Sequence, residues 1–301
     1  MEIKYFVYQN ENQERIDKYL ANELEEATRT QVQLYIKDSL VLVNDKIVKS
    51  NYILKNNDEI KITIPDPVEQ NVIAQDIPLD IYYEDSDVIV INKPSGMVVH
   101  PAVGNYKDTL VNALLYHCKD LSGINGVIRA GIVHRIDKDT SGLLVACKND
   151  LAHKSLSEQF QKKSTTRKYY AIVYGVINHN LGKIDAPVGR DPIYRQQMTV
   201  VEGGKNAVTH FKVIERFKKY TLVELTLETG RTHQIRVHMK YIGFPLVGDP
   251  LYGPKRVIGT HGQFLHAKTL GFTHPRTGEF MEFESPLPDY FVDFLNEIRQ
   301  E

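Results

Sequence analysis

Residues 130–146 constrain the fold most, because a charged segment there lies between two apolar runs. The runs Gly131 to Val133 and Leu143 to Ala146 are typical of short buried strands. The segment between them carries both charge signs and ends in a Thr-Ser-Gly turn. Polar side chains held between two buried strands stand where a cleft can form, so Asp137 is a candidate catalytic carboxylate. The alternative is a loop whose Asp, Thr and Ser side chains satisfy their own backbone.

The same segment resembles the signature of the RluA/RluD family of RNA pseudouridine synthases, His-Arg-Leu-Asp followed by Thr-Ser-Gly. Here the signature runs from His134 to Gly142, with Ile136 where the family mostly has Leu. The run Thr229 to His238 resembles the family's Thr-Gly-Arg-x-His-Gln-Ile-Arg-x-His, and Phe264 to Ala267 is similar to its Leu-His-Ala run. The resemblance covers nearly the whole chain apart from a linker, and it implies an RNA pseudouridine synthase.

The resemblance also implies individual roles. Asp137 matches the catalytic aspartate, and Arg236 matches the arginine that pairs with it. Tyr169 falls in a Lys/Arg-x-Tyr-x-Ala pattern that holds the family's active-site tyrosine, although a single strand tyrosine is usually a packing residue. Leu265 would wall the base pocket, unless it is an ordinary core leucine. Arg135 would fill the gap that a flipped-out uridine leaves in the RNA stack, or else contact phosphate.

The implied reaction needs neither a cofactor nor a metal, because the product is an isomer of the substrate. A single ionised carboxylate suits it, and the pattern is compatible with attack on the sugar, attack on the base or a glycal route. A rival hypothesis is a metal hydrolase using His134, Asp137, His233 and His238, but His233 and His238 lack the spacing and the glutamate of a His-Glu-x-x-His site. Further rivals are a non-catalytic RNA-binding protein and a glycosidase that releases uracil.

Residues 1–66 resemble the RNA-binding domain first described in small-subunit ribosomal protein S-four. The pattern predicts two short helices, a hairpin and one further strand. The resemblance makes Arg15, Lys18 and Arg29 candidate RNA-binding residues. Acidic residues outnumber basic ones in this segment, however, so these charges are alternatively an ordinary solvated helix surface.

The polar, proline-containing stretch 67–78 is expected to be a linker, and 79–301 the catalytic domain. By the resemblance, this domain is α+β, with a mixed, mostly antiparallel sheet, flanking helices and a central cleft. Apolar spacing predicts helices after Asp108, over 151–161, after a Thr232 cap and from Asp289 onward.

Composition bounds the remaining expectations. The 301 residues carry 37 basic and 38 acidic side chains, so any RNA contact must come from charges gathered on one face. Cys118 and Cys147 are expected to be buried thiols in a reducing compartment. The start of the chain lacks a signal peptide pattern, and no apolar stretch approaches the ~20 residues that span a bilayer. We therefore expect a cytoplasmic monomer whose partner is RNA, with large-subunit ribosomal RNA favoured and transfer RNA as the alternative.

Overall fold

The computed structural model describes residues 2–10, 13–24, 29–64, 72–101, 105–123, 130–194 and 197–301. The chain divides into two compact units, Met1–Gln70 and Asn71–Glu301. Residues 67–71 of the expected linker lie outside the described residues. The same holds for Thr28, at the expected start of the second helix of the first unit.

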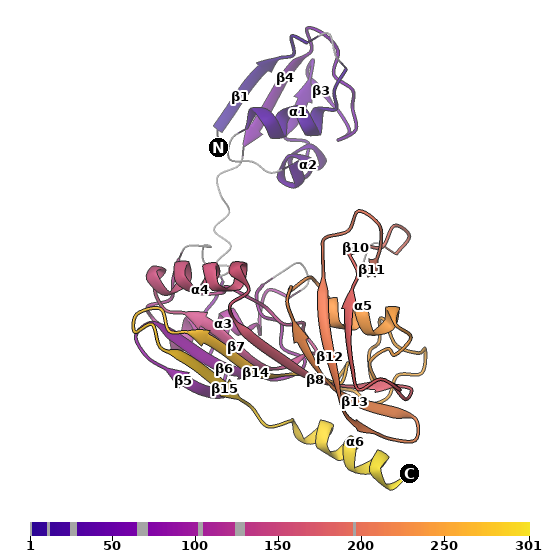
Figure 1. Cartoon of the computed structure of the whole chain (residues 1–301). Helices are drawn as coiled ribbons and strands as arrows, with labels where there is room; N and C mark the ends of the chain where they lie inside the picture. Colours follow the sequence, from indigo (N-terminus) through magenta and orange to yellow (C-terminus); the bar gives the residue numbers. More distant parts are fainter. Residues whose placement is uncertain are drawn as a thin grey trace. The chain divides into compact units, whose positions relative to one another are not determined.

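The first unit is a four-stranded antiparallel sheet with two helices packed on one face (Figure 1). Its elements are β1 (Glu2–Val7), α1 (Ile16–Glu23), α2 (Arg29–Lys37), β2 (Val41–Val43), β3 (Lys46–Ile47) and β4 (Glu59–Ile64). The strand order is β1-β4-β2-β3. Ile16 and Leu20 of α1 pack with Ile60 and Ile62 of β4, so the alternating isoleucines face the helices.

The predicted helices, hairpin and last strand of this unit are all present. Asn44 and Asp45 form the hairpin turn with positive φ angles of 50° and 60°, a conformation that Asn and Asp tolerate. Strand β1 had no sequence prediction. It pairs along its length with β4, from Glu2 opposite Ile64 to Val7 opposite Glu59, and the alternating pattern of so short an edge strand is weak.

The second unit is built on a nine-stranded mixed sheet in the order β5-β6-β7-β14-β8-β13-β12-β9, with β15 paired to β14. Its strands are β5 (Ile81–Glu84), β6 (Val88–Lys93), β7 (Ser141–Cys147), β8 (Thr166–Tyr174), β9 (Leu181–Asp185), β12 (Val208–Arg216), β13 (Tyr220–Leu227), β14 (Leu265–Thr273) and β15 (Phe280–Glu284). A separate hairpin joins β10 (Val188–Arg190) and β11 (Met198–Val200). The helices are α3 (Leu110–His117), α4 (Asp150–Lys162), α5 (Gln234–Tyr241) and α6 (Asp289–Gln300). The predicted α+β fold with a mostly antiparallel sheet is confirmed.

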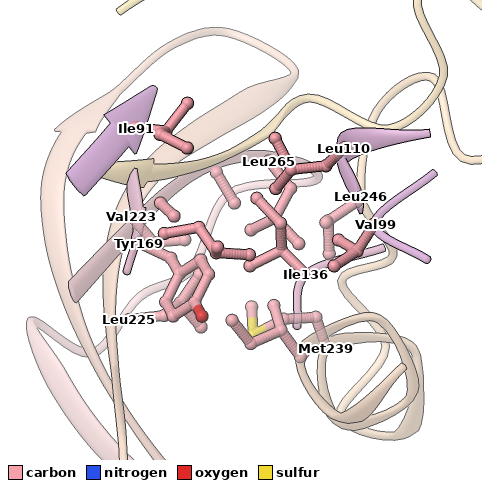
Figure 2. Packing of buried hydrophobic residues seen from close by; sticks show 14 of the residues in the cluster. Ile91, Val99, Leu110, Ile136, Tyr169, Val223, Leu225, Met239, Leu246 and Leu265 are labelled. Atoms are coloured by element: carbon pink, nitrogen blue, oxygen red, sulfur yellow. The ribbon is translucent and has the colours of Figure 1, made fainter. Parts of the chain in front are cut away.

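The two faces of this sheet bury different helices because strand side chains alternate in direction. Ile89 and Ile91 of β6 lie in one cluster with α3 and α5, whereas Val88 and Val90 lie in another with α4. Helix α6 packs on Ile172 of β8 and Leu222 of β13. The residues next to these two in their strands point to the opposite face of the sheet and belong to the first cluster. Ile136, Tyr169 and Leu265 belong to that first cluster (Figure 2). The candidate site residues therefore lie on the face that α3 and α5 cover.

Among the strands that the structure describes, the one parallel pairing lies at the central sequence motif. β7 pairs parallel with β14, with Ser141 opposite His266 and Gly142 opposite Ala267. Gly142 has φ 114°, and a Cβ there would lie 2.4 Å from the carbonyl oxygen of Ala267. The glycine of the Thr-Ser-Gly turn is therefore required by a close approach of two backbones.

Three local predictions were wrong. The segment Gly131 to Val133 makes only a single bridge, from Ile132 to Ala146, and is not a strand. The cap of α3 is Thr109 rather than Asp108, and a reciprocal pair of hydrogen bonds with Asn112 forms a capping box. Helix α5 starts after His233, which has φ 56° and caps nothing with its side chain, so Thr232 is not the cap.

Candidate active site

Asp137 lies in the loop that enters β7, and neighbours on both sides hold this loop in place. Ile136 is buried in the core, and the backbone carbonyl of Asp137 accepts a hydrogen bond from the Thr140 N–H at 3.1 Å. The ammonium of Lys93 is fully buried and donates to three carbonyl oxygens, including that of Lys138 at 2.9 Å. Burial lowers the pKa of Lys93 to about 7, against the opposing charges of Asp139 and Asp137. The side chain of Asp137 is 25% exposed and lines the cleft, so a ligand can reach it.

Arg236 connects this loop to α5. Its Nη1 donates to Oδ2 of Asp137 at 3.0 Å across 99 positions of sequence. The other side of the guanidinium binds Asp249 through two bonds, Nε to Oδ2 at 2.7 Å and Nη2 to Oδ1 at 2.9 Å. Its carbon atom lies 4.9 Å from the ring centre of Tyr252. This arrangement fixes the direction in which Arg236 presents its remaining donors to Asp137.

These contacts determine the direction in which the pKa values of Arg236 and Asp249 are shifted. Burial opposes the charge of Arg236, but Asp249 and Asp137 outweigh burial and raise its pKa. Burial likewise opposes the charge of Asp249, and the Arg236 bonds outweigh it and lower the pKa of that carboxyl. Oδ1 of Asp249 also accepts the backbone N–H groups of Leu251 and Tyr252, at 2.9 and 3.0 Å. Asp249 is thus a fixed anion behind the arginine.

A cleft of about 680 Å³ opens at the Asp137–Arg236 pair. Its wall contains all five residues that the sequence placed in the catalytic domain's site: Arg135, Asp137, Tyr169, Arg236 and Leu265. They come from the loop before β7, from β8, from α5 and from the start of β14. This volume is within the usual range of small-ligand pockets.

The side chains around the carboxylate differ in polarity. Tyr169 and Leu265 are both nearly inaccessible and belong to the core cluster that floors the cleft. Burial raises the pKa of the Tyr169 phenol, with Arg167 opposing and Asp137 assisting, so the phenol stays protonated at neutral pH. Arg135 is exposed, and its Nη2 donates to Oγ1 of Thr232 at 3.2 Å. The cleft therefore combines an apolar floor with a charged rim.

Two family models match the chain. The model described as RNA pseudouridylate synthase matches residues 87–241, which is more than half of the sequence. The model of the S4 domain matches residues 14–60 in the first unit.

The chain belongs to the RNA pseudouridylate synthase family.

Relatives of full length agree with this assignment. The RNA pseudouridine synthase YlyB of Bacillus subtilis is 59% identical, over 97% of this chain and 96% of that protein. The ribosomal large subunit pseudouridine synthase D of Pseudomonas aeruginosa is 44% identical, over 96% of this chain and 93% of that one. The structure of human RNA pseudouridylate synthase domain containing 1 aligns with a TM-score of 0.58 and 25% identity, over 79% of this chain and 98% of its own. The chain is an RNA pseudouridine synthase with an N-terminal S4 domain, and the resemblance read from the sequence is confirmed.

In the S4 domain of this pseudouridine synthase, two predicted RNA-binding arginines converge on a buried carboxylate. Asp17 accepts bonds from Arg15 at 2.9 and 3.0 Å, from Arg29 at 3.0 and 3.1 Å and from Gln33 at 2.6 Å. Burial raises the pKa of Asp17, but these bonds prevail and lower it to about 2. Lys18 forms an ion pair with Glu14, with 3.2 Å between its Nζ and Oε1 of Glu14. Arg29 of α2 therefore links the two helices through Asp17, whereas Arg15 binds Asp17 from the start of the same helix, α1. RNA binding by the three cations stays a prediction.

The histidines of the rival metal site have other partners. Nε2 of His134 accepts the N–H of Val145 at 3.0 Å, and burial together with the charge of Arg167 lowers its pKa to about 3. Both ring nitrogens of His238 are bonded, to Thr209 Oγ1 and to the Ala186 carbonyl oxygen, each at 2.9 Å. The imidazole of His134 is thus a neutral support for β7.

None of the described helices combines the length and apolar character that a membrane crossing requires.

Sequence reasoning missed the residues behind the reacting groups. Asp249 and Tyr252, which hold Arg236, lie in a loop between α5 and β14 with no apolar periodicity. Lys93 was not among the predicted site residues, yet its ammonium secures the loop of Asp137. A lysine that follows the apolar run Val88 to Ile91, with Asn92 between them, was the available signal, since a cation buried at the end of such a strand must have partners.

Proposed function

We propose that this pseudouridine synthase isomerises specific uridines in large-subunit ribosomal RNA, and that Asp137 acts on a target uridine turned out of its helix or loop. The observation that carries the role of Asp137 is its hydrogen bond to Arg236 in the wall of the cleft. Arg236 is itself held by Asp249. The choice of RNA rests on relatives named ribosomal large subunit pseudouridine synthase D, at 44% identity in Pseudomonas aeruginosa and 46% in Neisseria meningitidis.

The reaction breaks the bond between ribose C1′ and uracil N1 and forms a bond between C1′ and uracil C5. The proton of C5 leaves and N1 gains one, so atoms and electrons balance within the nucleotide and no cofactor is required. An ionised Asp137 either attacks as a nucleophile or abstracts a proton while it stabilises a cationic sugar. Arg236 donates a hydrogen bond to this carboxylate and places a permanent positive charge beside it.

Tyr169 and Leu265 form the surface against which the uracil ring packs. A protonated phenol beside Asp137 can stack on the base and donate or accept a proton once C5 is bonded to the sugar. The exposed guanidinium of Arg135, adjacent to the catalytic loop, would occupy the position the uridine vacates in the RNA stack. Unstacking a base costs a few kcal/mol, and such a replacement offsets part of that cost.

The S4 domain, with Arg15, Lys18 and Arg29, would add contacts to RNA outside the cleft. All the residues proposed for catalysis come from one chain, so a monomer suffices.

Mapping pseudouridines in cells that lack the protein tests this proposal. We expect specific uridines of large-subunit ribosomal RNA to lose the modification in these cells. The modification should return with the wild-type gene but not with Asp137→Asn. Loss confined to transfer RNA would refute the ribosomal assignment, and rescue by Asp137→Asn would refute the catalytic role.

A further inference from the structure

The wall of this enzyme's cleft carries more basic than acidic side chains. Besides Arg236, its wall contains Arg135, Lys163, Arg167 and Arg231. None of these four has a carboxylate within 4.0 Å among the residues that the structure describes. The second acid on the wall, Glu228, is engaged by His210 at 2.6 Å. Lys162, next to Lys163 but outside the cleft, is by contrast paired with Glu158.

Arg167 is the least accessible of the four unpaired cations. It lies on β8, two residues before Tyr169, and its guanidinium carbon is 5.6 Å from the ring centre of Phe160. Its Nε is buried and has no hydrogen-bond partner. A buried N–H of a charged group without an acceptor is rare in folded proteins, because desolvating it costs free energy that folding does not recover. The buried Nε is itself out of reach of a ligand. Arg167 nevertheless lines the cleft, so the terminal nitrogens of the same guanidinium can meet an acceptor that comes from outside the chain.

A glycine makes room for the Arg167 guanidinium, and two further cations lie on the same wall of the cleft. Gly230 faces Arg167 so closely that a Cβ there would lie 2.9 Å from Nη1. Arg231 follows in the same loop, where its Nε donates to the carbonyl oxygen of Asn206 at 3.0 Å. Lys163 ends α4 with φ 59° and is exposed. A lysine at a helix C-terminus is favourable by itself, but Arg167 and Arg231 come from two other elements and line the same cleft.

We propose that Arg167, with Lys163 and Arg231, forms a phosphate-binding subsite that holds the RNA backbone beside the target nucleotide. The subsite rests on the proposed function and adds a binding role to that same cleft. Arginine matches the geometry of phosphate with paired donors, and lysine adds a point charge. Residues two apart on a strand share a face and lie about 6.6 Å apart, which is within the size of one nucleotide. A base against Tyr169 would therefore bring its own backbone within reach of Arg167.

The salt dependence of RNA binding tests the subsite. The probe is large-subunit ribosomal RNA transcribed without modification, and the protein is the full chain. We expect Arg167→Gln to weaken binding about tenfold and to reduce the slope of log K against log salt by about 0.7 to 0.9, the value for one lost phosphate contact. KM should rise accordingly, while kcat falls less than threefold. Arg167→Lys keeps the charge and should restore the slope but only part of the affinity.

Lys162→Gln is the matched control, because it removes one charge from α4 outside the cleft. It should leave affinity and slope at wild-type values. If Arg167→Gln has the slope of wild type and of Lys162→Gln, the subsite is refuted. Should Arg167→Gln not fold, as thermal unfolding would reveal, the exposed variants Lys163→Gln and Arg231→Gln must each lower the slope, and unchanged slopes refute the subsite instead.

Failure of the proposed function has a different signature. Wild-type enzyme that forms no pseudouridine in this RNA refutes the ribosomal assignment only. The same binding comparison is then made with unmodified transfer RNA, where an unchanged slope for Arg167→Gln again refutes the subsite.

Discussion

Replacing Asp249 with asparagine should damage both stability and catalysis, although this residue does not line the cleft. The carboxylate of Asp249 makes two charged bonds to Arg236 and accepts two backbone N–H groups. Asparagine keeps one oxygen but turns an amide N–H₂ toward the guanidinium, which then stays buried with Asp137 as its one remaining anion. Removing one partner of a buried ion pair costs about 3–5 kcal/mol. We therefore expect the free energy of unfolding to fall by about 3–5 kcal/mol for Asp249→Asn.

The rate should fall as well, because Arg236 would no longer be held toward Asp137. We expect at least a tenfold lower kcat, since positioning groups behind a reacting pair commonly contribute that much. Urea unfolding and single-turnover pseudouridine formation at saturating RNA measure the two effects. Asp87→Asn is the control, because Asp87 is equally buried and, outside the cleft, accepts hydrogen bonds from Nε and Nη2 of Arg276, each at 2.7 Å. It should lower stability but not kcat.

The pH dependence of the free energy of unfolding below about pH 5 tests the role of Asp249 independently. Burial opposes ionisation of Asp249, yet the Arg236 bonds leave its pKa below the ordinary value. A depressed folded-state pKa contributes stability above the unfolded value, about 3.9, and that contribution is lost as pH falls through the folded value. The stability difference between wild type and Asp249→Asn should be constant above about pH 5 and shrink below about pH 4. A variant within 1 kcal/mol of wild type at pH 7, with kcat within threefold, would refute this reasoning.

Three further predictions concern stability. Gly142→Ala should lower the free energy of unfolding by about 3 kcal/mol, because the new Cβ meets the Ala267 backbone at a φ of 114°; a thermal shift below about 2 °C would contradict this. Lys93→Met should be compared with wild type from pH 7 to 10: burial lowers the folded pKa of Lys93 to about 7, so wild type should gain stability relative to the variant as pH rises, and a flat difference would count against it. Asp17→Asn should destabilise the S4 domain at neutral pH, and because the pKa of Asp17 is lowered to about 2, the difference should vanish as pH falls from about 4 to 2; acid titration of unfolding decides this.

The sequence predicted the elements that rest on strong periodicity. Alternating isoleucines marked β4, and the tyrosine-rich alternation of β8 placed Tyr169 on the face opposite Ile172. The Asp137–Arg236 contact was expected from resemblance, because no local pattern joins residues 99 positions apart. The short strand β1 was missed, since its pairing with β4 and not its own pattern defines it.

Backbone geometry and buried polar partners explain what local sequence patterns did not predict. Thr232 has the side chain of a cap, yet α5 begins after His233 in a left-handed conformation that a histidine seldom adopts. The three RNA-binding candidates of the S4 domain looked alike in sequence, but the buried Asp17 draws Arg15 and Arg29 to itself. Asp249 had no sequence signal because its significance lies in the distance to an arginine brought near by the fold.

The most direct test of the account is pseudouridine formation by Asp137→Asn at saturating RNA, with the binding of the same RNA measured in parallel. Asparagine has nearly the size of aspartate and still accepts a bond from Arg236, so the cleft should keep its shape. We predict that turnover falls at least about a thousandfold while RNA affinity stays within about threefold of wild type. Turnover within tenfold of wild type, or a loss of binding that accounts for all the lost activity, would contradict the assignment of Asp137 as the catalytic carboxylate.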